Sequence, residues 1–292
     1  MIKHRTGIIL IVSCLQLVAG AVWAQKRSVS SGQKVQKGYK LVWADEFNRA
    51  GAPDSANWNY ETGLERNEEL QWYQKENAWC ENGKLVIEAR RELRPNPLYK
   101  AGSTGWRTKR DSIHYTSSCI KTRNKQSWLY GRFIMRGKID IRDGLWPAWW
   151  TLGAHRPWPA NGEIDIMEYY RHKLLANIAH KGADGKARWF STISDIDSLG
   201  GARWAAQFHI WRMDWDEEGI ALYADDQLLL QTPMDSLVNQ DGSGENPFKQ
   251  PHYMLLDFAI GGQQGGDPSK TTFPARFEVD YVRVYQKSNG VR

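Results

Sequence analysis

The sequence predicts an all-β fold, a sandwich or barrel built from short antiparallel strands. Runs of β-branched and aromatic residues recur along the chain, and turn-forming segments such as Glu81-Asn82-Gly83 and Ala224-Asp225-Asp226 separate them. No convincing long amphipathic helix interrupts these runs. Because strands do not alternate with helices, the pattern disfavours a parallel α/β sheet.

The expected strands follow one another through most of the chain, which indicates one domain. Their span is at the upper end of what a single all-β domain occupies. We therefore expect one catalytic domain at residues 39–287 and a C-terminal tail at residues 288–292. The runs that read as strands are residues 40–43, 85–89, 131–136, 164–170, 208–215, 220–223, 253–260 and 277–285.

The first residues have the pattern of a secretory signal peptide. A basic start is followed by an apolar run and by the small-residue exit Val22-Trp23-Ala24, so we expect a signal peptide at residues 1–24 and export of the protein. The alternative is a lipoprotein signal with lipidation at Cys14. Residues 25–38 are polar and read as a flexible leader. The mature chain is expected to have no transmembrane segment.

The charge and cysteine content narrow the classes of function. The net charge of +6 includes Lys3 and Arg5, which leave with the signal peptide, so nucleic acid is not an expected partner. Cys80 and Cys119 could form one disulfide in an exported protein, although the sequence does not show that they meet. No cluster of Cys and His residues has zinc-site spacing, and we expect no cofactor for catalysis.

The segment Gly162–Tyr170 carries the residues that indicate chemistry. Strand alternation places Glu163 and Asp165 on one face and Ile164 and Ile166 on the other. Glu168 breaks this alternation, because a regular strand would turn its carboxylate into the core at a high desolvation cost. A one-residue β-bulge near Ile166-Met167 removes the conflict and brings all three carboxylates into one groove.

Two carboxyl groups facing one groove suit retaining glycoside hydrolysis. In that reaction one carboxylate attacks the anomeric carbon, and the other protonates the leaving oxygen. The same residues could instead form a structural calcium site or a solvated acidic strand. Fifteen Trp and twelve Tyr residues favour a sugar cleft, because flat amphipathic rings stack on sugar faces. Three of the tryptophans lie just upstream of the acids, at Trp146, Trp150 and Trp158.

Five segments, taken in order, resemble glycoside hydrolase family 16 and in particular its laminarinase-like β-glucanases. The resemblance covers residues 39–286. It implies a concanavalin-like β-jelly-roll sandwich of two curved antiparallel sheets with a concave substrate cleft. The matching segments are Leu41–Phe47, Asn67–Tyr73, Trp146-Pro147-Ala148, Glu163–Glu168 and Val279–Tyr285.

The resemblance also implies roles for individual residues. It makes Glu163 the nucleophile and Glu168 the acid/base, with Asp165 between them as a supporting catalytic carboxylate. Met167, the extra residue, places the chain in the bulged branch of the family, which disfavours a dedicated lichenase. Sugar contacts are implied for Trp146, Trp150, Trp158, Asn67 and His180, and a possible structural calcium ion for Glu46 and Asp280.

Two departures from the laminarinase pattern bear on the substrate. Cys119 stands where laminarinases often carry an arginine, and the tract at residues 177–199 matches no laminarinase pattern closely. We expect a monomeric, retaining endo-β-glycosidase whose partner is a polysaccharide, a β-1,3 or mixed β-1,3/1,4 glucan. The alternatives are an endo-β-galactosidase acting on galactan or host glycan and a non-catalytic sugar-binding sandwich.

Overall fold

The computed structural model describes residues 38–288. The predicted signal peptide, all of the predicted leader except Gly38, and residues 289–292 lie outside the described residues. The first strand begins at Tyr39 and the last ends at Lys287. Within the described part of the chain, no helix is long and apolar enough to cross a membrane.

Two sheets make up the fold, and all strand pairs are antiparallel except β3 with β6. The ten-stranded sheet has the order β15 (Gln227–Pro233), β14 (Gly219–Ala224), β13 (His209–Trp215), β8 (Gly131–Lys138), β17 (Ala275–Lys287), β5 (Lys84–Pro95), β6 (Ser112–Ser117) and β3 (Gln71–Tyr73), with β1 (Tyr39–Asp45) paired to β17 and β4 (Ala78–Glu81) paired to β5. The seven-stranded sheet has the order β12 (Ala187–Asp195), β11 (Lys173–Lys181), β10 (Glu163–Tyr170), β9 (Leu145–Gly153), β16 (His252–Ile260), β7 (Cys119–Lys121) and β2 (Asn59–Tyr60).

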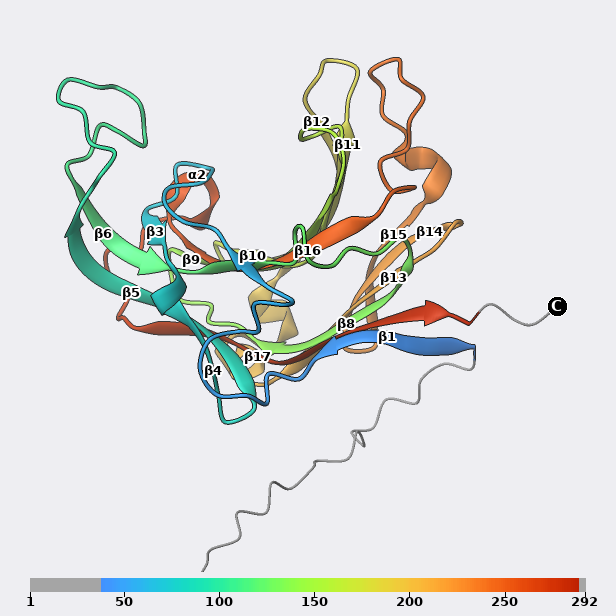
Figure 1. Cartoon of the computed structure of the whole chain (residues 1–292), viewed down its shortest axis with the longest axis horizontal. Helices are drawn as coiled ribbons and strands as arrows, with labels where there is room; N and C mark the ends of the chain where they lie inside the picture. The colour runs from blue at the N-terminus through green and yellow to red at the C-terminus, as the bar shows by residue number, and fades with distance from the viewer. Residues whose placement is uncertain (1–37, 289–292) are drawn as a thin grey trace, which may run out of the picture. The chain divides into compact units, whose positions relative to one another are not determined.

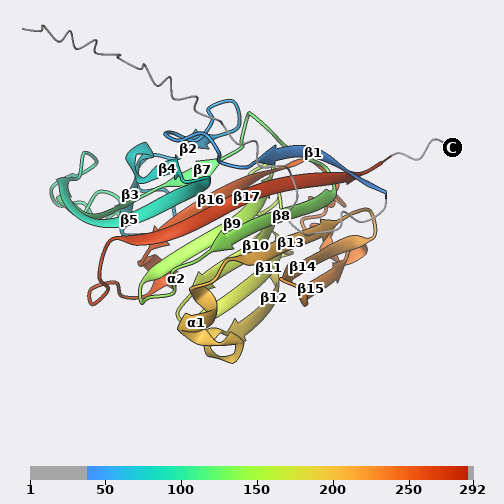
Figure 2. The same cartoon turned by 90° about the horizontal axis from the view of Figure 1, so that it is seen from below.

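Helices are few and short in this part of the chain. They lie in connections between strands: η1 (Lys75–Asn77), η2 (Ile196–Leu199), α1 (Gly201–Ala205), η3 (Met234–Leu237) and α2 (Gly262–Gly265). Figure 1 shows β9, β10 and β16 stacked above β8 and β17, with β11 and β12 rising on one side and β5 and β6 on the other. Figure 2, from below, shows β17 and β8 running side by side across the opposite face.

The predicted jelly-roll sandwich is therefore confirmed. Every run that reads as a strand in the sequence forms one: β1, β5, β8, β10, β13, β14, β16 and β17. The longer strands that the sequence did not indicate are β9, β11, β12 and β15. Of these, β9 and β11 are buried on both faces along most of their length, so they lack the apolar–polar alternation that identifies a half-buried strand.

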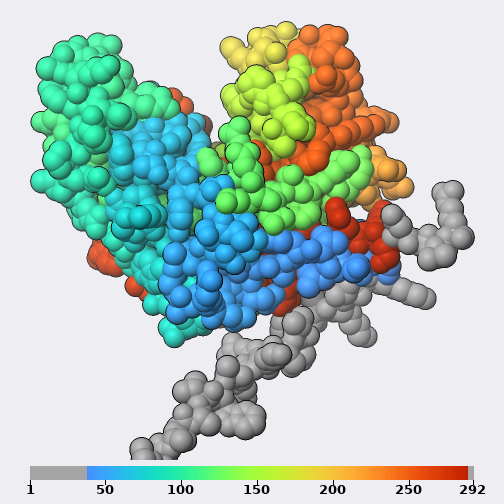
Figure 3. Space-filling model, viewed as in Figure 1, coloured from blue at the N-terminus to red at the C-terminus, as the bar shows by residue number. Residues whose placement is uncertain are grey.

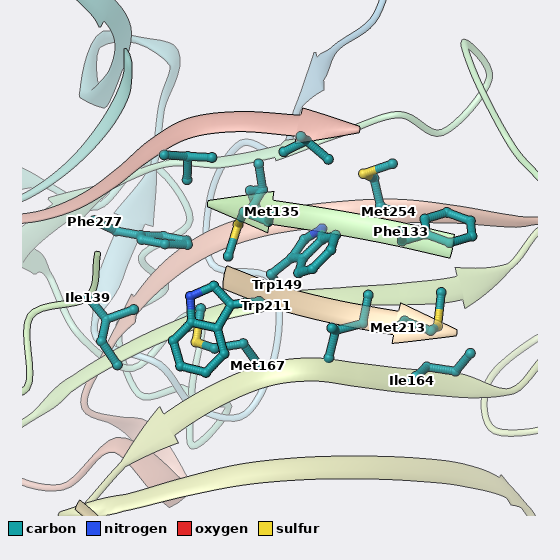
Figure 4. Close-up of a cluster of buried hydrophobic side chains, with 14 of the residues drawn as sticks. Phe133, Met135, Ile139, Trp149, Ile164, Met167, Trp211, Met213, Met254 and Phe277 are labelled. Atoms are coloured by element: carbon teal, nitrogen blue, oxygen red, sulfur yellow. The ribbon is translucent and has the colours of Figure 1, made fainter. Parts of the chain in front are cut away.

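The core lies between the two sheets. Phe133 and Met135 of β8 project from one sheet, and Trp149 of β9 and Ile164 of β10 project from the other, all with 0 % exposure. Figure 4 shows these side chains interleaved with Trp211 in one continuous cluster. Close packing of this kind fixes the sheet from which the cleft is built.

The predicted bulge in β10 is confirmed. Asp165 pairs with Trp150 of β9, but the next pair is Met167 with Trp149. The extra residue is therefore Ile166, whereas the family resemblance implies Met167. The register with β11 shifts at the same place, between Asp165 and Glu168. Ile166 and Met167 both enter the core with 0 % exposure, and Glu168 returns to the face that carries Asp165.

Met167 contributes to stability through the core, whereas the bulge depends on the number of residues in the strand. We expect Met167→Ala to lower the free energy of unfolding by about 2–4 kcal/mol, because it leaves a cavity between the sheets. The number of residues in the strand is unchanged, so the bulge is kept. The folded variant should therefore keep kcat/KM within about threefold, which corresponds to less than about 1 kcal/mol in the activation free energy. Chemical denaturation and kinetics on the same preparation test this, and a well-folded but inactive variant would contradict it.

Candidate active site

A cleft of about 570 Å³ crosses the outer face of the seven-stranded sheet. Residues of β16, β9, β10, β11 and β12 form its floor and one side, and the loop 66–69 closes the other side. Figure 3 shows the surface hollowed between the side formed by β5 and β6 and the side formed by β11 and β12. The cleft thus runs across the strands rather than along them.

The three carboxylates of β10 meet in this cleft. Glu163, Asp165 and Glu168 all line it, as the alternation and the bulge predicted. Asp165 lies beside Glu163 on the cleft face of β10. Burial raises the pKa of Asp165, and the negative charge of Glu163 raises it further.

Each of the three predicted tryptophans donates its indole N–H to a carboxylate. Trp158 Nε1 lies 2.6 Å from Glu163 Oε2, and Trp146 Nε1 lies 2.8 Å from Glu168 Oε1. Trp150 Nε1 lies 2.6 Å from Oδ1 of Asp257, a carboxylate of β16. Trp158 is 52 % exposed, whereas Trp146 and Trp150 are buried in the cleft floor. The tryptophans therefore orient the acids as well as lining the cleft.

Asn177 of β11 connects two of the acids, and the sequence analysis did not identify it. Its Nδ2 donates to Asp165 Oδ2 at 3.0 Å and to Glu168 Oε2 at 2.8 Å. Asn177 pairs directly with Asp165 across the strands, so both side chains point into the cleft. A signal was present in the sequence, because Asn177 is the one polar residue between Leu174 and Ala179.

Burial raises the pKa values of the three cleft carboxyls. Desolvation raises the pKa of Glu163 to about 7, while the hydrogen bond from Trp158 opposes the shift. Desolvation, followed by repulsion from Asp165, raises the pKa of Glu168 well above its usual range. Desolvation, followed by repulsion from Glu163, does the same for Asp165. The shift of Glu168 suits a group that must hold a proton at neutral pH.

The loop at one side of the cleft supplies a positive charge. Asn67 lines the cleft as predicted, and its Nδ2 lies 3.4 Å from Glu69 Oε1. Arg66, which the sequence analysis did not identify, also lines the cleft, forms an ion pair with Glu61 and lies over the Trp150 ring at 5.2 Å. Position 119 is a cysteine in this chain, and the arginine that reaches the cleft comes from another segment.

The expected sugar contact of His180 is wrong. Ala179 pairs with Glu163 and faces the cleft side, so strict alternation in β11 turns His180 to the core face beside Ile178. The His180 ring is fully buried and stacks on Phe190 at 5.9 Å. Burial also lowers its pKa, which keeps the imidazole neutral.

The possible calcium site is not supported by the positions of its residues. Arg283 donates to both carboxylate oxygens of Glu46, at 2.7 and 2.8 Å, and Arg136 Nη1 lies 2.7 Å from Asp280 Oδ2. Each carboxylate is thus neutralised by its own arginine, Glu46 by Arg283 of β17 and Asp280 by Arg136 of β8. Among residues 38–288, no group of three or more His, Cys, Asp or Glu side chains is arranged to hold a metal ion.

The disulfide that the sequence allowed is not formed. Cys80 and Cys119 are free thiols, both buried. Cys80 belongs to the large core between the sheets, whereas Cys119 packs beneath the cleft with Tyr73 and Trp150.

Comparison with known proteins agrees with this geometry. Residues 66–283 match the model of the glycosyl hydrolases family 16. The chain belongs to glycoside hydrolase family 16. It is 35 % identical to a β-glucanase of Rhodothermus marinus over 266 residues, which cover 85 % of each chain. The laminarinase-like resemblance seen in the sequence is confirmed.

Two solved structures superpose closely on the chain. The laminarinase catalytic domain of Thermotoga maritima has a TM-score of 0.72 at 31 % identity, covering 87 % of this chain and 100 % of that domain. An enzyme from a study of endo-acting O-glycanases of human gut bacteria that initiate mucin breakdown has a TM-score of 0.79 at 30 % identity, covering 88 % and 94 %. The chain is a glycoside hydrolase.

The raised pKa of Glu163 predicts a stability effect of Glu163→Gln that depends on pH. Between about pH 4.5 and 7 the unfolded state ionises Glu163 while the folded state keeps it protonated, so the wild type loses stability as pH rises. Glutamine avoids this loss and can still accept the Trp158 hydrogen bond. We expect the variant to gain stability over the wild type, by up to about 3 kcal/mol, as pH rises through this window.

Urea denaturation at pH 4.5, 6 and 8 measures this difference. Glu217→Gln is the matched control, because Glu217 is exposed in the turn between β13 and β14. A gain that does not change with pH, or one that the control shares, would contradict the raised pKa of Glu163.

Proposed function

We propose that the chain is an exported, retaining endo-β-glycosidase that hydrolyses β-1,3 or mixed β-1,3/1,4 glucan, with Glu163 as nucleophile and Glu168 as acid/base. The observation that carries the proposal is the bulge in β10, which turns both glutamates into one cleft. Their hydrogen-bond donors differ, since Trp158 serves Glu163, whereas Trp146 and Asn177 serve Glu168. Two carboxyls in different surroundings can hold different protonation states.

The reaction follows in two displacements. Glu163 attacks the anomeric carbon as the glycosidic C–O bond breaks, and the proton of Glu168 passes to the leaving oxygen. A covalent glycosyl ester on Glu163 results. Glu168, now a carboxylate, takes a proton from water, and the oxygen of that water attacks the same carbon and releases Glu163. Two inversions give overall retention of the anomeric configuration.

Asp165 and Asn177 act as positioning residues in this scheme. We assign Asp165 the protonated form, because burial raises its pKa well above the usual range, and this leaves Glu163 as the carboxylate that attacks. Asn177 holds Glu168 and Asp165 at a fixed separation through its two hydrogen bonds. Glu168 remains protonated at neutral pH because burial disfavours its ionised form.

Glucan is the first proposed substrate because the R. marinus relative is a β-glucanase and the T. maritima neighbour is a laminarinase. One observation favours the second candidate, an endo-β-galactosidase acting on galactan or host glycan. The neighbour from the study of mucin-degrading O-glycanases superposes with a TM-score of 0.79, and Cys119 replaces the arginine often found in laminarinases. A non-catalytic sugar-binding role is disfavoured by the complete set of acids.

The remaining parts of the proposal concern the whole protein. We infer that residues 1–24 direct export and are removed, with lipidation of Cys14 as the alternative, and that residues 39–287 form the catalytic domain. The enzyme is proposed to work as a monomer without a cofactor. A structural calcium ion would have to displace the arginines that now neutralise Glu46 and Asp280.

Glu163→Gln and Glu168→Gln each remove one essential step, so we expect each to lower kcat by at least about 10³-fold without unfolding the protein. Wild type and both variants are incubated with laminarin, mixed-linkage β-glucan, agarose and mucin-type glycans, and the products are sized. Shortened glucan from the wild type alone supports the first candidate, and shortened galactan or mucin glycan alone supports the second. Near-normal turnover by a folded Glu163→Gln variant contradicts the assignment.

A further inference from the structure

Strand β12, at the edge of the seven-stranded sheet, presents an unusual row of side chains to the cleft. Trp189, Ser191 and Ile193 alternate along its outer face and line the cleft. Trp189 is 45 % exposed and Ile193 is 60 % exposed. The intervening Phe190 turns to the other face and packs against His180. Trp189 is therefore a cleft residue and does not belong to the core.

The strand register relates this row to the catalytic acids. Glu163 pairs with Ala179, and Ala179 pairs with Trp189, so these three residues form one line across the sheet. Paired residues point to the same face, and neighbouring strands lie about 4.8 Å apart, which places the Trp189 backbone about 10 Å from that of Glu163. This distance is within the reach of a disaccharide that extends from the point of cleavage.

Ile193 occupies the equivalent place beside the second acid. Glu168 pairs with Leu175, and Leu175 pairs with Ile193, so an apolar surface continues from the acid/base to the edge of the sheet. Leu175 is buried, and Ile193 forms the exposed end of this surface. The cleft thus has an apolar outer side, opposite the polar and charged loop that carries Arg66 and Asn67.

Exposed apolar side chains on an edge strand are a liability, because such strands invite pairing with other chains. Within residues 38–288, the exposed tryptophans are Trp158 and Trp189, and both border this cleft. Trp158 already has a partner in Glu163. Trp189 has no comparable packing role, so its exposure on the cleft side requires another explanation.

We propose that Trp189 is the stacking platform of an outer sugar subsite on the β12 side of the cleft, with Ile193 completing its apolar surface. This inference rests on the proposed function, because the occupant is a sugar ring of the same polysaccharide chain that Glu163 and Glu168 cut. The apolar C–H face of a sugar ring suits an indole face. The subsite is continuous with the catalytic cleft, and only substrates that extend past β11 reach it.

The first test compares short and long substrates. End-labelled oligosaccharides of increasing length are cut by the wild type, by Trp189→Ala and by Trp189→Phe, and kcat/KM is measured for each length. We expect Trp189→Ala to lower kcat/KM by about tenfold on the long substrates and to leave it unchanged on the shortest one that is cut. Trp189→Phe should restore most of the loss. The label identifies the end of the chain that occupies the subsite.

Tyr99→Ala is the matched control, since Tyr99 is 46 % exposed in the β5–β6 connection, outside the cleft. Equal effects of Trp189→Ala and Tyr99→Ala at every length, or an equal loss on short and long substrates, would overturn the subsite.

A binding measurement separates this inference from the proposed function. Calorimetry with laminarin and with mucin-type glycan compares Glu163→Gln alone with Glu163→Gln/Trp189→Ala. A Kd raised about tenfold by the second substitution supports the subsite even if the wild type cuts neither polysaccharide. An unchanged Kd with a polysaccharide that the wild type does cut overturns the subsite and leaves the proposed function intact.

Discussion

The single extra residue in β10 is the constraint on which the rest of the site depends. A regular strand cannot present Glu163, Asp165 and Glu168 on one face while it buries Ile164 and Met167 on the other. The bulge at Ile166 satisfies both requirements, because it adds an apolar residue to the core and shifts the register for Glu168. Packing between the sheets therefore holds the acids in place, and the chemistry depends on the core.

The cost of this arrangement is electrostatic. Three carboxyls share one partly desolvated cleft, and burial raises the pKa of each. The indole donors of Trp146 and Trp158 and the amide of Asn177 lower these pKa values in part, but they do not cancel the shifts. The buried carboxyls thus lower the free energy of unfolding, which is expected where catalysis needs a buried acid. The same donors give the two glutamates different surroundings and hence different roles.

The sequence was sufficient to predict the parts of the fold and site that follow from local rules. Alternation and turn residues identified β1, β5, β8, β10, β13, β14, β16 and β17, and the broken parity at Glu168 identified the bulge. The acids and the three tryptophans were found because they lie close together in the chain. The strands β9, β11, β12 and β15 were not identified. In β9 and β11, burial on both faces removes the alternation.

Residues brought to the site by the register of distant strands could not be predicted in the same way. Asn177 reaches the acids because it pairs with Asp165. His180 follows Ala179 in the same strand, and alternation turns it to the face away from the cleft. Arg66 enters from a loop whose path depends on the whole fold. Trp189 is a cleft residue because β12 lies at the sheet edge and pairs Trp189 with Ala179.

The central claim is that the bulge brings Glu168 to the same cleft as Glu163. Glu163 then attacks the anomeric carbon while Glu168 serves as acid/base. The most direct measurement traps the covalent intermediate with a 2-deoxy-2-fluoro glycoside of the sugar that the enzyme cuts, and locates the adduct by mass spectrometry of the peptide containing residues 163–168. The account predicts one glycosyl ester, on Glu163, and a first product that keeps the β configuration. An adduct on Asp165 or Glu168, or a first product of inverted configuration, would contradict it.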